Sequence, residues 1–201
     1  MSSITPSSSA PPGMSHSYTV GTCTLELVTG DVARQQTEAI GNAANALLLG
    51  GGGVDGAIHR AAGPALLDAC RAVKKTLPNG VLRTGGAVIT PGFDLPAKHV
   101  VHCVGPIYDR EGPDAPAMLA SCYREALRIV REKNITSISF PSIATGVYGY
   151  PVHDAAPVAI GTVLDEIEAH GRPALVRFVL YDAVTYQAYV DAADARLQAH
   201  S

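Results

Sequence analysis

The feature that most constrains the fold is a regular alternation between short apolar segments and longer amphipathic ones. The short segments have the length and β-branched content of strands; they are residues 18–28, 38–41, 87–90, 99–104, 137–140 and 175–180. The longer segments repeat apolar residues at helical spacing; they are residues 54–62, 64–75, 117–133, 157–170 and 184–198. Strands separated by helices predict an α/β fold, with a largely parallel sheet and helices on both faces. We expect the segment 18–28 to form a single strand at a sheet edge.

The length and the N-terminal composition indicate one domain. The 201 residues suffice for a single α/β domain with a core, which we expect to span residues 18–201. Residues 1–17 are rich in Ser and Pro, without the apolar stretch of a secretory signal or the arginines of a mitochondrial transit peptide. We expect them to form a disordered tail. No apolar run reaches the roughly 18 residues of a membrane span.

The charge balance argues against a nucleic-acid partner, and the cysteines indicate the compartment. Eighteen acidic and fifteen basic side chains give a net charge of −3, without the basic excess typical of nucleic-acid binding. The four cysteines include no C-x-x-C pair and are typical of free thiols in a reducing cytosol. We therefore expect a cytoplasmic monomer that binds neither nucleic acid nor a membrane.

A run of four glycines, residues 50–53, directly precedes the expected helix 54–62. Glycines let main-chain N–H groups approach a ligand closely, and the N-terminus of the helix adds a partial positive charge at the same place. No Lys or Arg occurs between residues 35 and 59. This loop, Gly50 to Gly56, therefore predicts an anion site built from backbone groups, rather than a flexible surface turn.

The same loop contains G-x-G-x-x-G, the pattern of dinucleotide-binding folds, at residues 51–56. That pattern needs an acidic residue about 20 positions later for the ribose hydroxyls, and no Asp or Glu occurs from residue 69 to residue 93. A nicotinamide-dependent oxidoreductase therefore stays only as a rival hypothesis. The phosphate-binding P-loop is excluded, because the chain has no Gly-Lys dipeptide.

The surroundings of the loop carry a more specific pattern. Residues 42–45 read NAAN and residues 50–64 read GGGGVDGAIHRAAGP; further matching segments are TGD at 29–31, LPAK and HCVGP within 95–106, residues 140–151, and YD at 181–182. With these segments the chain resembles the macrodomains, in particular the MacroD-type branch that includes bacterial O-acetyl-ADP-ribose deacetylases. The resemblance covers residues 18 to about 198. It implies a three-layer α/β/α macrodomain with a central mixed, mostly parallel sheet.

The resemblance also implies a site for ADP-ribose. Asp31 and the backbone of Val32 would bind the adenine, on whose face Tyr181 would stack. Asn45 would hydrogen-bond the distal ribose, while Asn42 would brace the loop. The backbone groups expected around the diphosphate and distal ribose belong to two loops, formed by Gly51, Gly52, Gly53 and Val54 and by Ala144, Thr145, Gly146, Val147 and Tyr148.

Asp55 decides between an enzyme and a binding module. By resemblance, the hydrolytic branch has a carboxylate here, whereas many macrodomains that only read ADP-ribose lack one. Together with Asn45, Asp55 would hydrolyse esters of the distal ribose, either O-acetyl-ADP-ribose or mono-ADP-ribose on acidic side chains of proteins. Both are the expected partners, and a non-catalytic reader is the alternative. His59, four residues on, shares the helix face of Asp55 and would position it.

Two positions depart from the family pattern. Gly41 stands where valine is usual, which should loosen the strand beneath the loop, and Ala144 replaces a serine near the phosphates. Either change is expected to weaken ligand binding. We expect no metal and no cofactor, because His99 and His102 would point to opposite faces of a strand.

Overall fold

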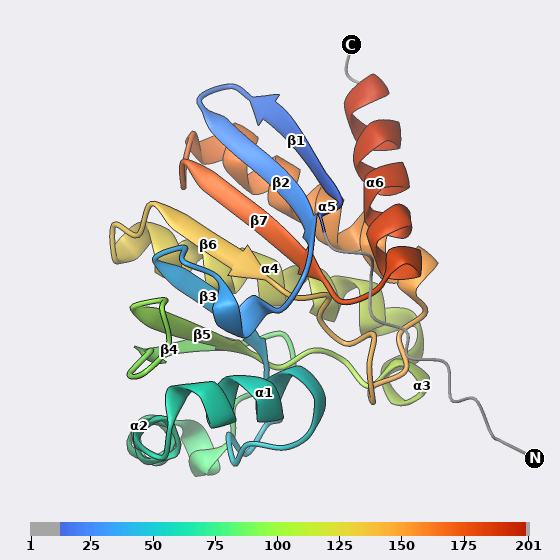
Figure 1. The fold of residues 1–201 in the computed structure, drawn as a ribbon. Coiled ribbons are helices and arrows are strands. Elements are labelled where there is room, and N and C mark those ends of the chain that lie inside the picture. The colour runs from blue at the N-terminus through green and yellow to red at the C-terminus, as the bar shows by residue number, and fades with distance from the viewer. Residues whose placement is uncertain (1–12, 200–201) are drawn as a thin grey trace, which may run out of the picture.

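The computed structural model describes residues 13–199 and forms a seven-stranded sheet between two layers of helices (Figure 1). The strand order is β1-β2-β7-β6-β3-β5-β4. The strands are β1 Ser15–Val20, β2 Cys23–Thr29, β3 Ala39–Ala43, β4 Ala87–Pro91, β5 His99–Cys103, β6 Ser137–Phe140 and β7 Leu175–Leu180. The five central strands are parallel to one another, while β1 and β4 pair antiparallel with β2 and β5 at the two edges. The mixed, mostly parallel sheet predicted from the sequence is confirmed.

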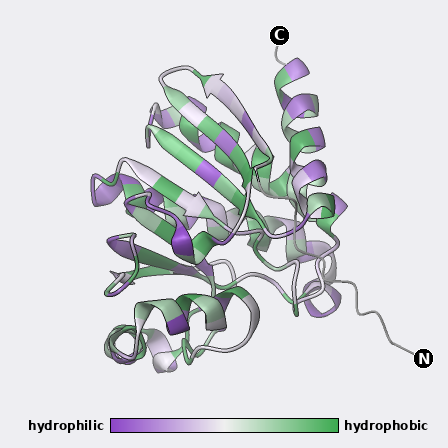
Figure 2. Ribbon diagram, viewed as in Figure 1, coloured by the Kyte–Doolittle hydropathy of each residue, from purple (hydrophilic) through white to green (hydrophobic). Residues whose placement is uncertain are grey.

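The helices cover the two faces of the sheet unequally. They are α1 Gly53–Ala62, α2 Ala65–Lys74, α3 Tyr108–Glu111, α4 Ala115–Glu132, α5 Val152–His170 and α6 Ala183–Gln198, with short 3-10 turns η1 Val32–Arg34, η2 Pro78–Gly80 and η3 Gly112–Asp114. The larger core lies under α4, α5 and α6, and the smaller core lies under α1 and α2. Figure 2 shows that hydrophobic residues follow the strands and the helix sides that face them. None of the described helices is long and apolar enough to cross a membrane.

The N-terminal part of the sheet differs from the prediction. Residues 18–28 form a hairpin of two antiparallel strands instead of one strand, because Gly21 turns the chain with a φ of 59°. The edge position is correct for β1. Ser15 to Ser17, which the sequence places in the N-terminal tail, instead pair with Val28 to Glu26 in β1 and β2. Residues 1–12 of that tail, and residues 200–201 of the domain, lie outside the described part.

One helix begins earlier than predicted. The sequence predicts it over residues 157–170. The helix α5 instead starts at Val152, directly after Pro151, and Pro157 lies inside it.

The parallel strands bring the loops that follow them together at the carboxyl ends of the strands. The glycine loop follows β3, the segment of Gly105 follows β5, and the loop of residues 141–151 follows β6. Asp31 and Tyr181 lie just beyond the ends of the neighbouring strands β2 and β7, whose residues Thr29 and Leu180 are paired. Ligands of open parallel sheets bind at the carboxyl ends of the strands.

Gly41 does not loosen β3, contrary to the prediction. A Cβ atom at Gly41 would lie 2.5 Å from Cδ1 of Phe140, so the aromatic ring already occupies the space of the missing side chain. The Phe140 ring packs in turn against Tyr123 and Phe178 in the larger core. The glycine and the phenylalanine therefore complement each other across neighbouring strands.

We expect the substitution Gly41→Val to lower the free energy of unfolding by about 1–3 kcal/mol, the usual effect of overpacking a filled core. Urea unfolding measures this change. The double variant Gly41→Val/Phe140→Leu should recover part of the loss, because the smaller side chain makes room for valine. A single variant as stable as the wild type would contradict the complementarity.

Candidate functional site

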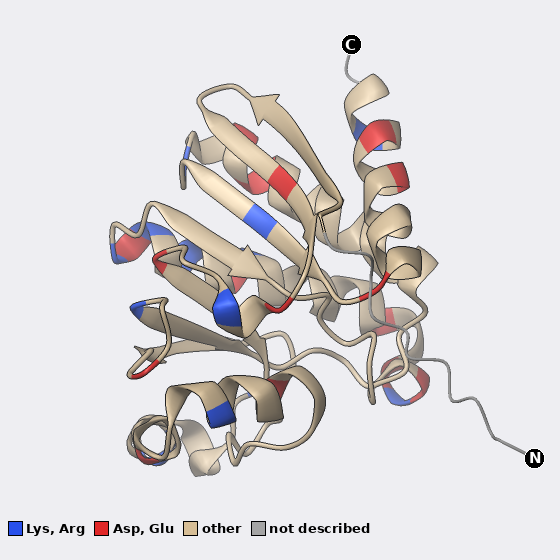
Figure 3. Cartoon of the chain, viewed as in Figure 1, with Lys and Arg blue, Asp and Glu red and all other residues tan. Residues whose placement is uncertain are grey.

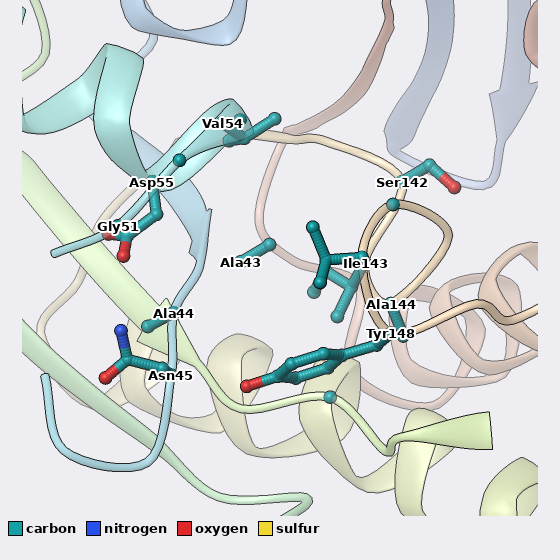
Figure 4. Close-up of a pocket in the computed structure, with 15 residues that line it drawn as sticks. Ala43, Ala44, Asn45, Gly51, Val54, Asp55, Ser142, Ile143, Ala144 and Tyr148 are labelled. Carbon is teal, nitrogen blue, oxygen red and sulfur yellow. The ribbon is translucent and has the colours of Figure 1, made fainter. Parts of the chain in front are cut away.

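A cavity of about 270 Å³ opens between the loop after β3 and the loop after β6. Figure 4 shows Asp55 and Asn45 on one side of this space, with Ile143 and Tyr148 opposite them. The lining residues are Ala43, Ala44, Asn45, Gly51, Gly52, Gly53, Val54, Asp55, Gly105, Ser142, Ile143, Ala144, Gly146, Val147 and Tyr148. Asp55 is the one charged residue among them, and no Lys or Arg of the described chain lines the cavity. Figure 3 shows where the charged residues lie along the ribbon.

The glycine loop folds tightly against the first turn of α1. A Cβ atom at Gly56 would lie 2.4 Å from the carbonyl oxygen of Gly51, so only glycine permits this approach. Gly50 and Gly53 have φ angles of 75° and 56°, in the left-handed region that favours glycine. The helix begins after Gly52 without a side-chain cap. The first N–H groups of a helix have no partner within it, and Gly53, Val54 and Asp55, which carry them here, line the cavity, as an anion site requires.

The second loop is held from behind by hydroxyl groups. The Tyr123 hydroxyl accepts a hydrogen bond from the Ile143 N–H, and the Tyr189 hydroxyl donates to Ser142 Oγ. Thr145 Oγ1 also donates to Ser142 Oγ, and Thr145, unlike Ser142, is not among the residues that line the cavity. These bonds fix the backbone of the loop without using the side chains on its outer rim.

Small residues shape the wall of the second loop. Ala144 has a φ of 68°, an uncommon conformation for a residue with a side chain. A Cβ atom at Gly105 would lie 2.9 Å from Cβ of Ala144, so the two residues pack as closely as their sizes allow. Val147 also lines the cavity, and it is 98% exposed.

Asn45 braces the glycine loop, a role that was expected of Asn42. Asn45 donates from Nδ2 to the Gly50 carbonyl at 2.8 Å, and its Oδ1 accepts from the N–H groups of Leu47 and Leu49. It thus braces the loop while still lining the cavity. Asn42 is fully buried, does not line the cavity, and donates to Asp55 instead.

Asp55 is a carboxylate held inside the protein near the start of α1. It is 6% exposed, and its Oδ1 accepts from Asn42 Nδ2 at 2.8 Å and lies 3.4 Å from His59 Nε2. Its Oδ2 is turned toward Gly51, on the cavity side. Burial raises the pKa of Asp55, and the neighbouring Asn42 and His59 offset part of that rise. The carboxyl group therefore presents one bonded oxygen and one oxygen open to a water or ligand.

A buried line of polar side chains lies behind Asp55. Asn42 Nδ2 is 3.1 Å from His102 Nδ1, and His102 Nε2 is 2.8 Å from Thr90 Oγ1. Burial lowers the pKa of His102 to about 3. Sequence reasoning weighed His102 only as a metal ligand and missed this line entirely.

Other predicted site residues lie outside the cavity. Asp31 accepts a hydrogen bond from the Ala33 N–H at 2.9 Å, as the N-terminal cap of η1, which also contains Val32. Tyr181 is 72% exposed. The lining residues that sequence reasoning did not name as site residues are Ala43, Ala44, Gly105, Ser142 and Ile143. Their positions beside the named ones, at the ends of β3, β5 and β6, are the signal that could have found them.

The lowered pKa of His102 predicts a pH dependence of stability. The unfolded chain protonates this histidine near pH 6.5 and the folded chain only near about pH 3, so the unfolded state binds more protons between these values. The stability is present above the unfolded pKa and is lost as the pH falls, at on the order of 1 kcal/mol per pH unit. Urea unfolding measures the free energy of unfolding between about pH 7 and about pH 4. Its slope against pH should be smaller for His102→Gln than for the wild type. The less buried His99→Gln is the control, and equal slopes for all three proteins would contradict the prediction.

Comparisons with known proteins agree with the geometry. The macro domain family model matches residues 41–159. The O-acetyl-ADP-ribose deacetylase of Salmonella typhimurium is 48% identical over 168 residues, covering 84% of this chain and 93% of that protein.

Solved structures show the same fold. The Oceanobacillus iheyensis macrodomain with ADP has a TM-score of 0.89 and 45% identity, covering 92% of this chain and 97% of that one. The Trypanosoma brucei macrodomain in complex with ADP-ribose has a TM-score of 0.75 and 40% identity, covering 83% of this chain and 68% of that one. The fold, the backbone-lined cavity and these similarities together establish that the chain belongs to the macrodomain family.

Proposed function

We propose that this macrodomain binds ADP-ribose in the cavity and hydrolyses groups that are ester-linked to the distal ribose. The substrates are O-acetyl-ADP-ribose and proteins that carry mono-ADP-ribose on acidic side chains, since both contain such an ester. The observation that carries the proposal is the buried carboxylate of Asp55, placed within a cradle of backbone N–H groups. Relatives named O-acetyl-ADP-ribose deacetylase support it.

The diphosphate lies, in this proposal, between the two loops that line the cavity. The N–H groups at the start of α1 bind it from one side and those of residues 144–148 from the other. Tyr148 closes over the phosphates, and Asn45 faces the distal ribose. The adenine extends toward the ends of β2 and β7, where Asp31 and Val32 bind its edge and Tyr181 stacks on its face.

Asp55 acts on a water molecule in the proposed reaction. Its Oδ2, on the cavity side, orients and polarises the water with help from the phosphate of the ligand. The water oxygen attacks the acyl carbon and gives up its proton to the carboxylate. The resulting intermediate breaks its bond to the ribose oxygen, which takes a proton and leaves as a hydroxyl group. Much of the acceleration comes from positioning, which Asn45 and the loops provide.

We also propose a cytoplasmic location and a monomer. Four free, buried thiols, Cys23, Cys70, Cys103 and Cys122, suit a reducing compartment.

We expect Asp55→Ala to reduce acetate release from O-acetyl-ADP-ribose by about a hundredfold or more, the usual contribution of a positioned base. Binding of ADP-ribose, measured by calorimetry, should change little, because the backbone cradle remains. The isosteric Asp55→Asn variant separates the loss of charge from the loss of volume and should be equally inactive. A wild-type protein that binds ADP-ribose tightly but releases no acetate would instead be a reader.

The pKa of Asp55 sets the acidic limb of the reaction. Only the ionised carboxylate can take a proton from water, so kcat/KM should fall as the pH drops through the pKa of this group. Because burial raises that pKa, the limb should lie above 3.8, the ordinary value of an aspartate. A pH profile of kcat/KM measures it. A limb at or below the ordinary aspartate value would show that Asp55 is not the group that titrates.

A further inference from the structure

Four buried side chains from four elements form one line of hydrogen bonds that ends at the carboxylate. Thr90 lies on β4, His102 on β5, Asn42 on β3 and Asp55 on α1, and each is at most 6% exposed. The donor–acceptor distances along the line are 2.8, 3.1 and 2.8 Å. Only Asp55 of this line reaches the cavity, so the other three have no contact of their own with a ligand there.

The chemistry of the groups fixes which atom donates at each step. An ionised carboxylate only accepts, so the Asn42 amide must direct one of its two Nδ2 hydrogens to Asp55 Oδ1. The second hydrogen then points at His102 Nδ1, which must accept it. Because burial lowers the pKa of His102 to about 3, the ring is neutral and carries its single proton on Nε2. That N–H donates to Thr90 Oγ1.

A reversed arrangement is possible only if Asp55 is protonated. If the His102 proton moved to Nδ1, it would face the Asn42 amide nitrogen, and the amide would have to turn over. Its Oδ1 would then lie against Asp55 Oδ1, and two acceptors repel each other unless the carboxyl group holds a proton. The side on which His102 carries its proton is therefore linked to the ionisation of Asp55.

The line is costly for the folded state, which argues against a purely structural role. Asn42 Oδ1 is buried and has no hydrogen-bond partner among the described residues. An unpaired buried polar atom destabilises a protein, and turning the amide over would leave its nitrogen unpaired instead. Apolar side chains at these positions would avoid that cost.

We propose that His102 is a positioning residue for the hydrolysis, which with its proton on Nε2 holds Asn42 in the orientation that donates to Asp55. This arrangement engages Oδ1 and leaves Oδ2 for the attacking water. The proposal rests on the proposed function and adds the residues that prepare its carboxylate. Thr90 fixes the ring by accepting the Nε2 proton.

Other titratable groups also face Asp55 and must be considered in any pH profile. His59 comes from α1 itself, Cys70 from α2, His102 from β5 and Tyr148 from the second loop. Cys70 Sγ lies 3.8 Å from His102 Nε2 and is a weak second partner of the ring. The variants of the kinetic test, at Thr90 and Thr37, therefore leave all four groups in place.

The kinetic test uses Thr90→Val, which removes the acceptor for Nε2 at nearly constant volume. With O-acetyl-ADP-ribose, we expect kcat to fall about tenfold, the effect of one misdirected hydrogen bond, and the dissociation constant of ADP-ribose to stay within about twofold. The acidic limb of kcat/KM should move to higher pH, because the hydrogen bond from Asn42 lowers the pKa of Asp55. Thr90→Ser should restore the wild-type values.

The matched control is Thr37→Val. Thr37 is buried like Thr90, and its substitution likewise removes a buried hydroxyl group. That hydroxyl bonds to Ala39 O and Ser139 Oγ, and Thr37 does not line the cavity. Its kcat and pH profile should be those of the wild type. A Thr90→Val protein that differs from the wild type no more than Thr37→Val does would overturn the positioning role.

The second test reads the proton directly in the wild-type protein. Nitrogen-15 NMR of labelled histidines distinguishes protonated from bare ring nitrogens, and His102→Gln identifies the signals of His102. We expect the proton on Nε2 and a bare Nδ1. A proton on Nδ1 in an enzyme that releases acetate would overturn the positioning role alone. A wild-type protein that releases no acetate would overturn the proposed function, and with it the catalytic consequence of His102.

Discussion

The hydrogen bond between Asn42 and Asp55 is the contact on which the site depends. It joins β3 to α1 at 2.8 Å and is the shortest polar contact of a buried carboxylate, whose other neighbour, His59 Nε2, lies at 3.4 Å. The glycine loop must close between these two elements, and the close approach of Gly51 to Gly56 is what allows it. The same few residues therefore position the carboxylate and expose the helix N-terminus to the cavity.

The sequence predicted the parts of this site that are local in the chain. Four glycines before a helix indicate an anion cradle wherever the sheet places them, and Asp55 lies inside that pattern. The line from Thr90 to Asn42 could not be predicted in the same way. It depends on the pairing of Asn42 with His102 and of Val88 with His102 across three strands, and single-sequence patterns do not determine register between distant strands.

In the fold too, features set within one segment could be predicted, and features that depend on a neighbouring strand could not. Alternating apolar segments gave the strands of the parallel centre, whereas the hairpin of β1 and β2 was read as one strand, because Gly21 interrupts it by only a short turn. Gly41 was judged by its own strand, although its space is filled by Phe140 from the neighbouring one. A missing side chain weakens a strand only if no neighbour replaces its volume.

The absence of a basic side chain from the cavity lining suits the role proposed for Asp55, whose carboxylate a nearby cation would engage. A Lys or Arg beside the diphosphate would strengthen binding, but it would also lie within reach of the carboxylate and lower its pKa. Such a pair would engage Oδ2, the oxygen that the proposed reaction leaves for water. Backbone N–H groups attract the phosphates with partial charges that are fixed in direction and cannot turn toward Asp55. In the proposed function, a cradle of glycines therefore binds the anion and still leaves a carboxylate free to act beside it.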